Sequence, residues 1–194
     1  MEISEKELII KAQQGDQSAF EELIYNYDHG VLSVAMKYVR DPDDAKDIYQ
    51  EVFIRVFRGL KKFEFRSEFS TWLFRITTNV CLTYKTKKKE QMIVSLHEEF
   101  DEDKTDYENR ELQFDGLSPE EETTSSDLKI LINNAVDSLS AKQRITFVLK
   151  HYEGYKIREI AEMLNCKEGT VKKYLFDAIN NLRKKLRLIY ATEL

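Results

Sequence analysis

The sequence predicts an all-α protein of two small helical domains joined by an acidic, flexible linker, and three observations support this prediction. The 194 residues include only six glycines and two prolines, and 42% are hydrophobic, which is typical of a soluble helical protein. Apolar residues recur at helical spacing on both sides of the middle of the chain. The middle itself, residues 96–127, holds 2 basic and 13 acidic side chains. We therefore expect domains at residues 1–92 and 127–194, with a linker at 93–126.

The first domain is predicted to be a helical bundle. A short helix is expected over Glu5–Gln13, and a longer one follows, with apolar residues at helical spacing from Phe20 to Tyr38. Asp41 or Asp43 can cap the next helix, because a side-chain oxygen there satisfies free backbone N–H groups. That helix carries a broad apolar face as far as Leu60.

A polar stripe accompanies this apolar face. Asp47, Gln50, Glu51 and Ile54 fall at positions that share one side of the helix. The stripe is either a solvated face, a docking surface for a partner or a carboxylate cluster for a metal ion. Metal catalysis requires converging ligands from several elements, and no histidine or further acid is placed to help, so we expect neither a metal site nor enzyme chemistry.

The next stretch interleaves aromatic and basic residues before and within another helix. Aromatic rings can stack on unpaired bases, while cations contact phosphates, so this composition favours single-stranded nucleic acid. The alternative is that the aromatics are ordinary core. The candidate nucleic-acid-binding residues are Lys61, Lys62, Phe63, Arg66, Ser67, Phe69, Ser70, Thr71, Trp72, Arg75 and Asn79. The basic helix end Lys85–Glu90 either is solvated or touches backbone phosphates.

The acidic middle has no sustained apolar period, so it cannot bury enough surface to offset its chain entropy and is predicted to be a linker. It is either a solvated spacer or a mimic of nucleic acid that occupies a basic channel on a partner. The balance of charge supports a division of roles: residues 1–95 sum to zero, residues 96–127 to −11 and residues 128–194 to +6. A basic module tied to an acidic tether is typical of nucleic-acid-binding proteins.

The second domain contains a helix-turn-helix pattern. Ser140 is the expected cap of a preceding helix, a short helix follows from Ile157 to Leu164, and Asn165-Cys166 make the turn. In such motifs the second helix enters the major groove of DNA. The candidate DNA-binding residues on its outer side are Thr170, Lys172, Lys173, Tyr174 and Phe176. The alternative is two packed helices with no DNA role.

The remaining features set the context. No apolar run approaches the roughly 20 residues of a membrane span, and the N-terminus lacks the marks of a secretory signal. Cys81 and Cys166 stand far apart with no CxxC motif, so we expect neither a disulfide nor a zinc site. The expectation is a cytoplasmic protein without cofactor, metal or membrane insertion.

Two long stretches carry a resemblance to a known family. "DDAKDIYQEVFIRVFRGLKKFEFRSEFSTWLFRITTNV" resembles the second region of bacterial RNA polymerase sigma factors, and "LSAKQRITFVLKHYEGYKIREIAEMLNCKEGTVKKYLFDAINNLRKKL" is similar to their fourth region. The absence of other regions matches the extracytoplasmic-function (ECF) group of the sigma-70 family. The resemblance implies a factor that binds core RNA polymerase and directs promoter-specific initiation.

The resemblance also implies roles for the candidate residues. The stripe Asp47–Ile54 matches the surface that docks on the clamp helices of the largest polymerase subunit, and the fourth region is expected to meet the flap of the second-largest subunit. The loop from Phe63 to Ser70 matches the pocket for a flipped base of the −10 element. Trp72, Arg75 and Asn79 match the helix that melts and holds this element, and the helix from Gly169 matches the reader of the −35 element. The linker resembles the segment that threads the RNA exit channel.

Two departures from the family pattern bear on specificity. The base-capturing loop usually has a glycine and an acid where this chain has Phe65 and Arg66. The −35 helix usually carries Ser-Arg and a later Arg, in place of which stand Lys173, Tyr174 and Asp177. We therefore expect weak or unusual −35 readout, and an anti-sigma factor or a recruiting protein is a candidate partner.

Two other functions remain open at this point. An ordinary helix-turn-helix repressor or activator would bind duplex DNA without polymerase, and it has no use for the Asp47–Glu51 stripe. A carboxylate-cluster metalloenzyme would bind a divalent ion. Neither explains the aromatic loop.

Overall fold

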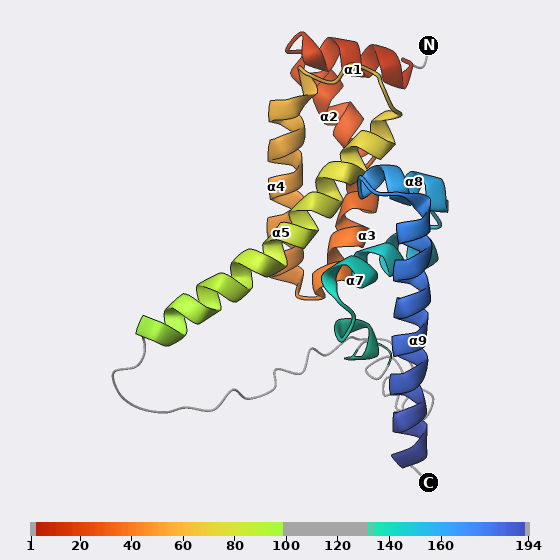
Figure 1. Ribbon diagram of the computed structural model, residues 1–194. Helices are drawn as coiled ribbons and strands as arrows, with labels where there is room; N and C mark the ends of the chain where they lie inside the picture. Colours follow the sequence, from red (N-terminus) through yellow and green to blue (C-terminus); the bar gives the residue numbers. More distant parts are fainter. Residues whose placement is uncertain (1–2, 99–131, 133, 193–194) are drawn as a thin grey trace, which may run out of the picture.

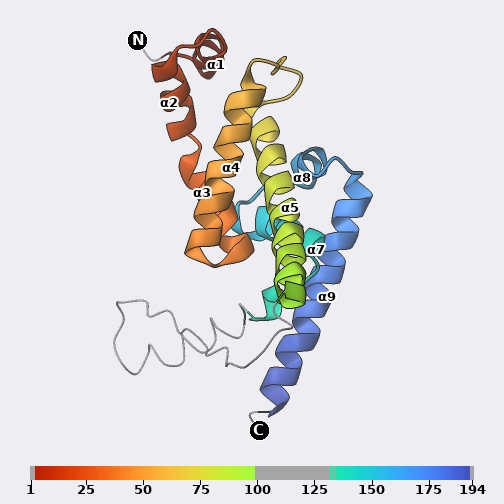
Figure 2. The ribbon, with the colours of Figure 1, turned by 90° about the vertical axis from the view of Figure 1, so that its left-hand side faces the viewer.

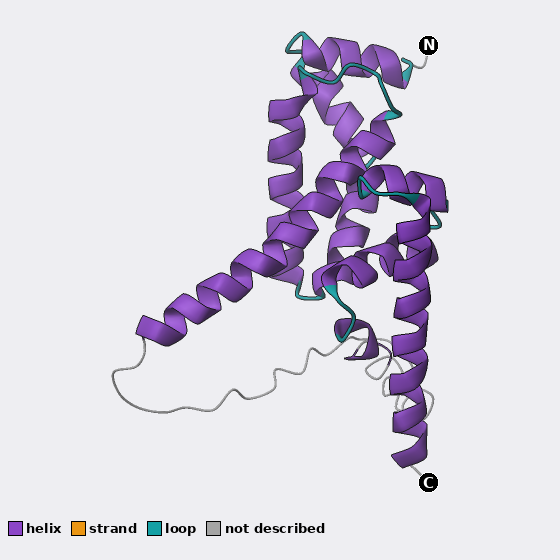
Figure 3. Ribbon diagram, in the orientation of Figure 1, coloured by secondary structure: helices purple, strands orange, loops and turns teal. Residues whose placement is uncertain are grey.

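The structure, a computed structural model, describes residues 3–98, 132 and 134–192, and these ranges contain helices and loops but no strand (Figure 3). The predicted all-α class is therefore confirmed. Of residues 85–98 and 188–192 only the backbone is described. The predictions for the side chains of Lys85–Glu90 and for the linker from residue 99 on thus lie outside the described residues, whereas residues 93–98, predicted to begin the linker, continue a helix. In the described part of the chain no helix is both long and apolar enough to cross a membrane.

The first part of the chain forms a bundle in which α5 crosses the other helices diagonally (Figure 1). Its helices are α1 (Glu5–Gln13), α2 (Gln17–Tyr25), α3 (Asp28–Val39), α4 (Pro42–Leu60) and α5 (Phe69–Glu98). Side-chain caps begin three of them: Ser4 forms a capping box with Glu7, Asp16 accepts from the N–H of Ala19, and Asp41 accepts from two N–H groups of the first turn of α4. The prediction that Asp41 or Asp43 caps α4 is met by Asp41.

The helix expected from Phe20 to Tyr38 is wrong in one respect, because the chain breaks between α2 and α3. Tyr27 leaves helical geometry, with φ −127° and ψ −8°. Its ring packs edge-on against Phe69 with centroids 5.4 Å apart, and its hydroxyl donates to a carboxylate oxygen of Glu5. These tertiary contacts, which an apolar period cannot reveal, favour the break.

The second part of the chain packs beside α5, as two views a quarter-turn apart show (Figure 2). It contains α7 (Ala141–Phe147), the π-helical turn η1 (Val148–Tyr152), α8 (Ile157–Met163) and the long α9 (Glu168–Thr192). The expected cap at Ser140 is confirmed, since its hydroxyl accepts from the N–H of Gln143 in a capping box. Gly154, with φ +75°, turns the chain toward α8.

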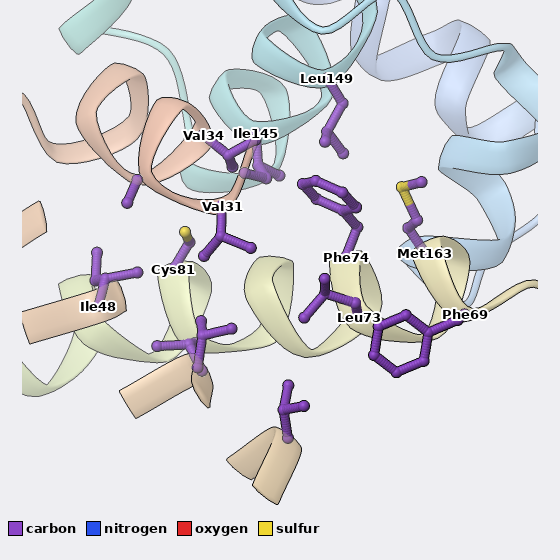
Figure 4. Close-up of a cluster of buried hydrophobic side chains, with 14 of the residues drawn as sticks. Val31, Val34, Ile48, Phe69, Leu73, Phe74, Cys81, Ile145, Leu149 and Met163 are labelled. Carbon is purple, nitrogen blue, oxygen red and sulfur yellow. The ribbon is translucent and has the colours of Figure 1, made fainter. Parts of the chain in front are cut away.

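One apolar core runs through both parts of the chain (Figure 4). It joins residues of α3 and α5 to residues of α7, η1 and α8, among them Val31, Val34, Leu73, Phe74, Ile145, Leu149 and Met163. Phe74 is central, because the residue is 3% exposed and its ring centroid lies 5.2 Å from that of Tyr155. Gly30 makes room for it: a Cβ there would lie 3.1 Å from the Phe74 ring. The two predicted domains are thus in direct contact.

Candidate nucleic-acid interface

The loop between α4 and α5 is fixed to the bundle by α1. The side-chain amide of Gln13 donates to the carbonyl of Leu60 at 2.9 Å and to that of Phe63 at 2.8 Å. The carbonyl of Leu60 also accepts from the N–H of Phe63 at 2.9 Å, so the Gln13 amide adds a second bond at the end of α4 and ties the following loop to α1. The sequence analysis missed Gln13, because nothing in its spacing relates it to residues almost fifty positions later.

Four aromatic rings from this loop and the start of α5 form a cluster, namely those of Phe63, Phe65, Phe69 and Trp72. Ring centroids in contact are 5.0 to 5.7 Å apart, in tilted or edge-on arrangements that aromatic quadrupoles favour. Phe63 and Phe69 are buried, Trp72 is half-buried and Phe65 is exposed. Gly59 of α4 lets Trp72 approach, since a Cβ there would lie 3.2 Å from the indole ring.

The predicted nucleic-acid-binding residues of this stretch divide by exposure. Lys61, Lys62, Arg66, Arg75 and Asn79 are exposed, and Arg66 pairs with Glu64 at 2.6 Å on the surface. A surface pair of this kind contributes about 0–1 kcal/mol, so Arg66 remains available.

The other predicted residues lie deeper. Ser67, Ser70 and Trp72 are half-buried, and Thr71 is buried together with the two interior rings of the aromatic cluster. In this structure Phe63, Phe69 and Thr71 therefore lie beneath the exposed residues of this stretch and support them by packing.

The predicted docking stripe lies on α4. Asp47, Gln50 and Ile54 are exposed, and Ile54 keeps 43% of its surface in solvent. Glu51 is half-buried and accepts from Arg55 Nε at 2.7 Å, while Asp47 accepts from the hydroxyl of Tyr84 at 3.2 Å. Within the described residues no group of three or more His, Cys, Asp or Glu side chains could hold a metal ion.

The helix-turn-helix has the expected geometry. Asn165 takes a left-handed conformation with φ +48°, and the N–H of Cys166 donates to the carbonyl of Ala161 at 2.9 Å, which closes the end of α8. Val171 and Leu175 of α9 are buried against this unit. On the outer side Lys172, Lys173 and Phe176 are exposed, whereas Thr170 and Tyr174 are half-buried. Phe176 has 66% of its surface in solvent, which excludes it from the core.

The end of α8 contacts one of the predicted DNA-binding residues. Arg75 of α5 donates from Nε at 3.0 Å and from Nη2 at 2.8 Å to the backbone carbonyl of Glu162. Nearby, the Thr78 hydroxyl donates to the carbonyl of Met163 at 3.4 Å. The C-terminus of a helix carries free carbonyls and a partial negative charge, which a guanidinium complements. Arg75 is therefore occupied by the second part of the chain.

A second contact joins α3 to the residues after η1. Glu153 accepts from the Ser33 hydroxyl at 2.8 Å and from Lys37 Nζ at 2.9 Å. The Glu153 side chain is 15% exposed, and Lys37 Nζ also lies 5.0 Å from the centroid of the Tyr152 ring. Partial burial makes this contact stronger than an ordinary surface pair.

A third contact centres on Asp137, which binds two arginines. Its carboxylate lies 2.6 Å from Arg40 Nη1 and 2.6 Å from Arg144 Nη2. Arg144 is almost fully buried and also donates from Nη1 to the carbonyl of Tyr38 at 2.9 Å. The sequence analysis missed Arg144, because α7 mixes polar and apolar residues and nothing in its sequence distinguishes the buried Arg144 from the exposed Lys142.

Comparison with known proteins decides the family. The models Sigma-70 region 2 and Sigma-70, region 4 match residues 16–91 and 129–182. The chain is 33% identical over 187 residues to the ECF RNA polymerase sigma factor SigW of Bacillus subtilis (strain 168), a match that covers 96% of this chain and 99% of SigW. This chain is an ECF sigma factor of the sigma-70 family. As such it binds core RNA polymerase and directs initiation at specific promoters.

Solved structures support the fold. The chain is similar to CnrH in complex with the cytosolic domain of CnrY, with a TM-score of 0.65 and 20% identity over 93% of this chain and 96% of that one. It is also similar to the sigma factor RpoE in complex with the anti-sigma factor NepR from Bartonella quintana, with a TM-score of 0.60 and 22% identity over 87% and 96%. Region 2 is residues 16–91, and region 4 is residues 129–182 together with the rest of α9.

Proposed function

We propose that region 2 of this sigma factor binds the opened −10 strand through the loop before α5 and the exposed side of α5 itself. The observation that carries this proposal is the aromatic cluster with exposed Lys61, Lys62 and Arg66 on the same loop and Asn79 farther along α5. Stacking on an aromatic ring contributes roughly 1–3 kcal/mol per base, and together with further contacts in the loop it offsets the few kcal/mol that unstacking a flipped base costs. The proposed mechanism is recognition of polymerase and DNA, and it includes no step in which a covalent bond is formed or broken.

The stripe on α4 is proposed to dock on the clamp helices of the largest polymerase subunit. Its members Asp47, Gln50, Glu51 and Ile54 combine exposed polar groups with one exposed apolar side chain. A polar rim around an apolar contact is the usual composition of a protein interface. Because it acts together with RNA polymerase, we propose that the protein is cytoplasmic.

Region 4 is proposed to contact the −35 duplex through Thr170, Lys172, Lys173, Tyr174 and Phe176 and to meet the flap of the second-largest subunit. Lys172 and Lys173 supply phosphate contacts, which position a protein on DNA without reading sequence. Asp177 is half-buried one turn from Lys173, and its charge opposes phosphate. The proposed −35 readout is therefore weak, and a recruiting protein or an anti-sigma factor is a proposed partner.

Region 4 packs against α5, the helix that carries part of the proposed −10 surface. The carbonyl of Glu162 holds the Nε and Nη2 groups of Arg75, which restricts how this side chain can approach a promoter strand. Full engagement of Arg75 by the −10 strand is therefore proposed to require region 4 to leave α5. The open chain loses the shared core around Phe74, so contacts with polymerase and DNA must replace that stabilisation.

Transcription in vitro with purified core polymerase and mapping of the RNA 5′ ends tests the proposed function. The chain should cause initiation at defined start sites, and Gln50→Arg should reduce binding to core polymerase at least tenfold, because it places a bulky cation in the proposed interface. Glu22→Gln, a change at an exposed position of α2, is the control and should behave like the wild type. A chain that neither binds core polymerase nor directs any start would refute the proposal.

A further inference from the structure

Phe65 occupies a backbone conformation that a bulky residue rarely takes. Its φ is +56°, in the left-handed region that favours glycine. Such outliers persist where the surroundings hold them, and they cluster at functional sites. The chain thus keeps a costly conformation at a position where glycine would adopt it freely.

The aromatic ring of Phe65 packs against other aromatic side chains that are themselves held in place. The Phe65 ring lies 5.0 Å from that of Phe63, which is itself buried against Phe69 and Trp72. Phe65 keeps 41% of its surface in solvent and is the exposed member of the aromatic cluster. The loop passes beside α1, from which Lys6 Nζ approaches within 5.8 Å of the Phe65 ring centroid (Figure 1).

The charges around this ring favour a polyanion. Lys6, Lys61, Lys62 and Arg66 are exposed cations near or on the loop, against the exposed acids Glu64 and Glu68. Glu64 pairs with Arg66 on the surface, an interaction that phosphate can replace at little cost. An exposed ring among cations is the arrangement that binds single strands without reading their edges.

From this geometry we infer that Phe65 is a stacking residue for one unpaired base of the promoter strand. The inference rests on the proposed function and deepens it: Phe65 lies in the loop predicted to capture a base but was not among the candidate binding residues. It also gives the strain a purpose: glycine at this position would relieve the backbone but carry no ring.

Binding of the holoenzyme to forked promoter DNA with an unpaired −10 strand tests this inference with three variants. Phe65→Tyr keeps both the ring and the strain, Phe65→Leu keeps the strain without the ring, and Phe65→Gly removes both. Tyr should bind like the wild type, while Leu and Gly should each lose about 5- to 150-fold in affinity, the equivalent of one lost stack. Phe65→Gly should unfold at a temperature equal to or above that of the wild type, which separates the lost affinity from lost stability.

A second experiment replaces single nucleotides of the −10 strand with abasic sites and measures the affinity again. One abasic position should weaken binding by the wild type but not by Phe65→Leu, because the stack is already absent. Equal affinity of all variants, with a wild type that binds, would overturn this inference and leave the proposed function standing. Weaker assembly of Phe65→Leu with core polymerase in the absence of DNA would instead assign the ring to a protein contact and also overturn it. Failure of the wild type to bind would reject the proposed function itself.

Discussion

Region 2 and region 4 differ in how they present their proposed DNA surfaces. On α9 of region 4, Lys172, Lys173 and Phe176 are exposed, whereas on α5 of region 2 Arg75 is held by the end of α8. The proposed surface for duplex DNA is thus accessible in the same conformation that restricts Arg75 on the proposed surface for the opened strand. The difference suggests an order of events: assembly with polymerase separates the regions, and strand capture follows.

The largest expected effect comes from Asp137→Ala, which removes the carboxylate between Arg40 and Arg144. Arg144 is almost fully buried, so in this variant a charged guanidinium would remain inside the protein without its acidic partner. Removing one partner of a buried pair typically costs about 3–5 kcal/mol, and we expect a value near the lower limit because Asp137 is 41% exposed. Urea unfolding measures the change.

The matched control for this variant is Asp43→Ala, since Asp43 forms an exposed pair with Lys46. Its effect should stay below about 1 kcal/mol. If both variants lost the same small amount of stability, the contact between α3 and region 4 would contribute little to the folded chain.

Glu153→Ala should weaken the closed conformation selectively. The variant loses the hydrogen bonds from Ser33 and Lys37, which join region 4 to α3. Hydrogen bonds to a charged group contribute about 1.5–3 kcal/mol when partly buried. The free variant should therefore bind a single-stranded −10 oligonucleotide about tenfold or more tightly than the wild type, and its radius of gyration in X-ray scattering should increase. Glu22→Gln, an exposed change on α2, should alter neither, and unchanged affinity in Glu153→Ala would contradict the restriction of α5.

Lys173→Ala probes the accessible surface of region 4. If Lys173 contacts a phosphate, the slope of log affinity against log salt for duplex promoter DNA should fall in magnitude by about one. Lys11→Ala, an exposed lysine of α1, should leave the slope unchanged. An unaltered slope in Lys173→Ala would remove this residue from the proposed interface.

The two cysteines report the stability of the two regions separately. Burial raises the pKa of the Cys81 thiol to about 12, so at pH 8 only about one molecule in 10⁴ carries the reactive thiolate. Cys166 in the helix-turn-helix is half-buried, and burial also raises its pKa. Iodoacetamide at pH 8 should therefore modify Cys166 first, and Cys81 only on unfolding of region 2, as peptide mass spectrometry can follow. Rapid modification of native Cys81 would show that the interior of region 2 opens easily.

The sequence predicted local structure well, because caps and turns depend on neighbouring residues. Asp41 and Ser140 cap helices as their places before apolar periods indicated, and Asn165 turns the chain between α8 and α9. Family resemblance supplied the two regions, which the comparisons confirmed.

The contact between the two regions could not be predicted in the same way. Arg75 and Arg144 bind backbone carbonyls, and every residue has a carbonyl, so residue identity does not reveal which one is bound. The same holds for Gln13, which holds two carbonyls of the distant loop. At Phe65 the glycine usual in the family was a signal for the left-handed conformation, but the aromatic residue in this chain does not itself indicate it.

Energy transfer between fluorophores on region 2 and region 4 tests most directly whether assembly separates them. Cysteines placed at the exposed positions Glu22 and Asn180, in a chain with Cys166→Ser, provide the labels, while native Cys81 stays buried. Transfer should be efficient in the free chain and should fall when core polymerase binds. Equal transfer in the free chain and in the holoenzyme would contradict the account, because region 4 would not leave α5 upon assembly.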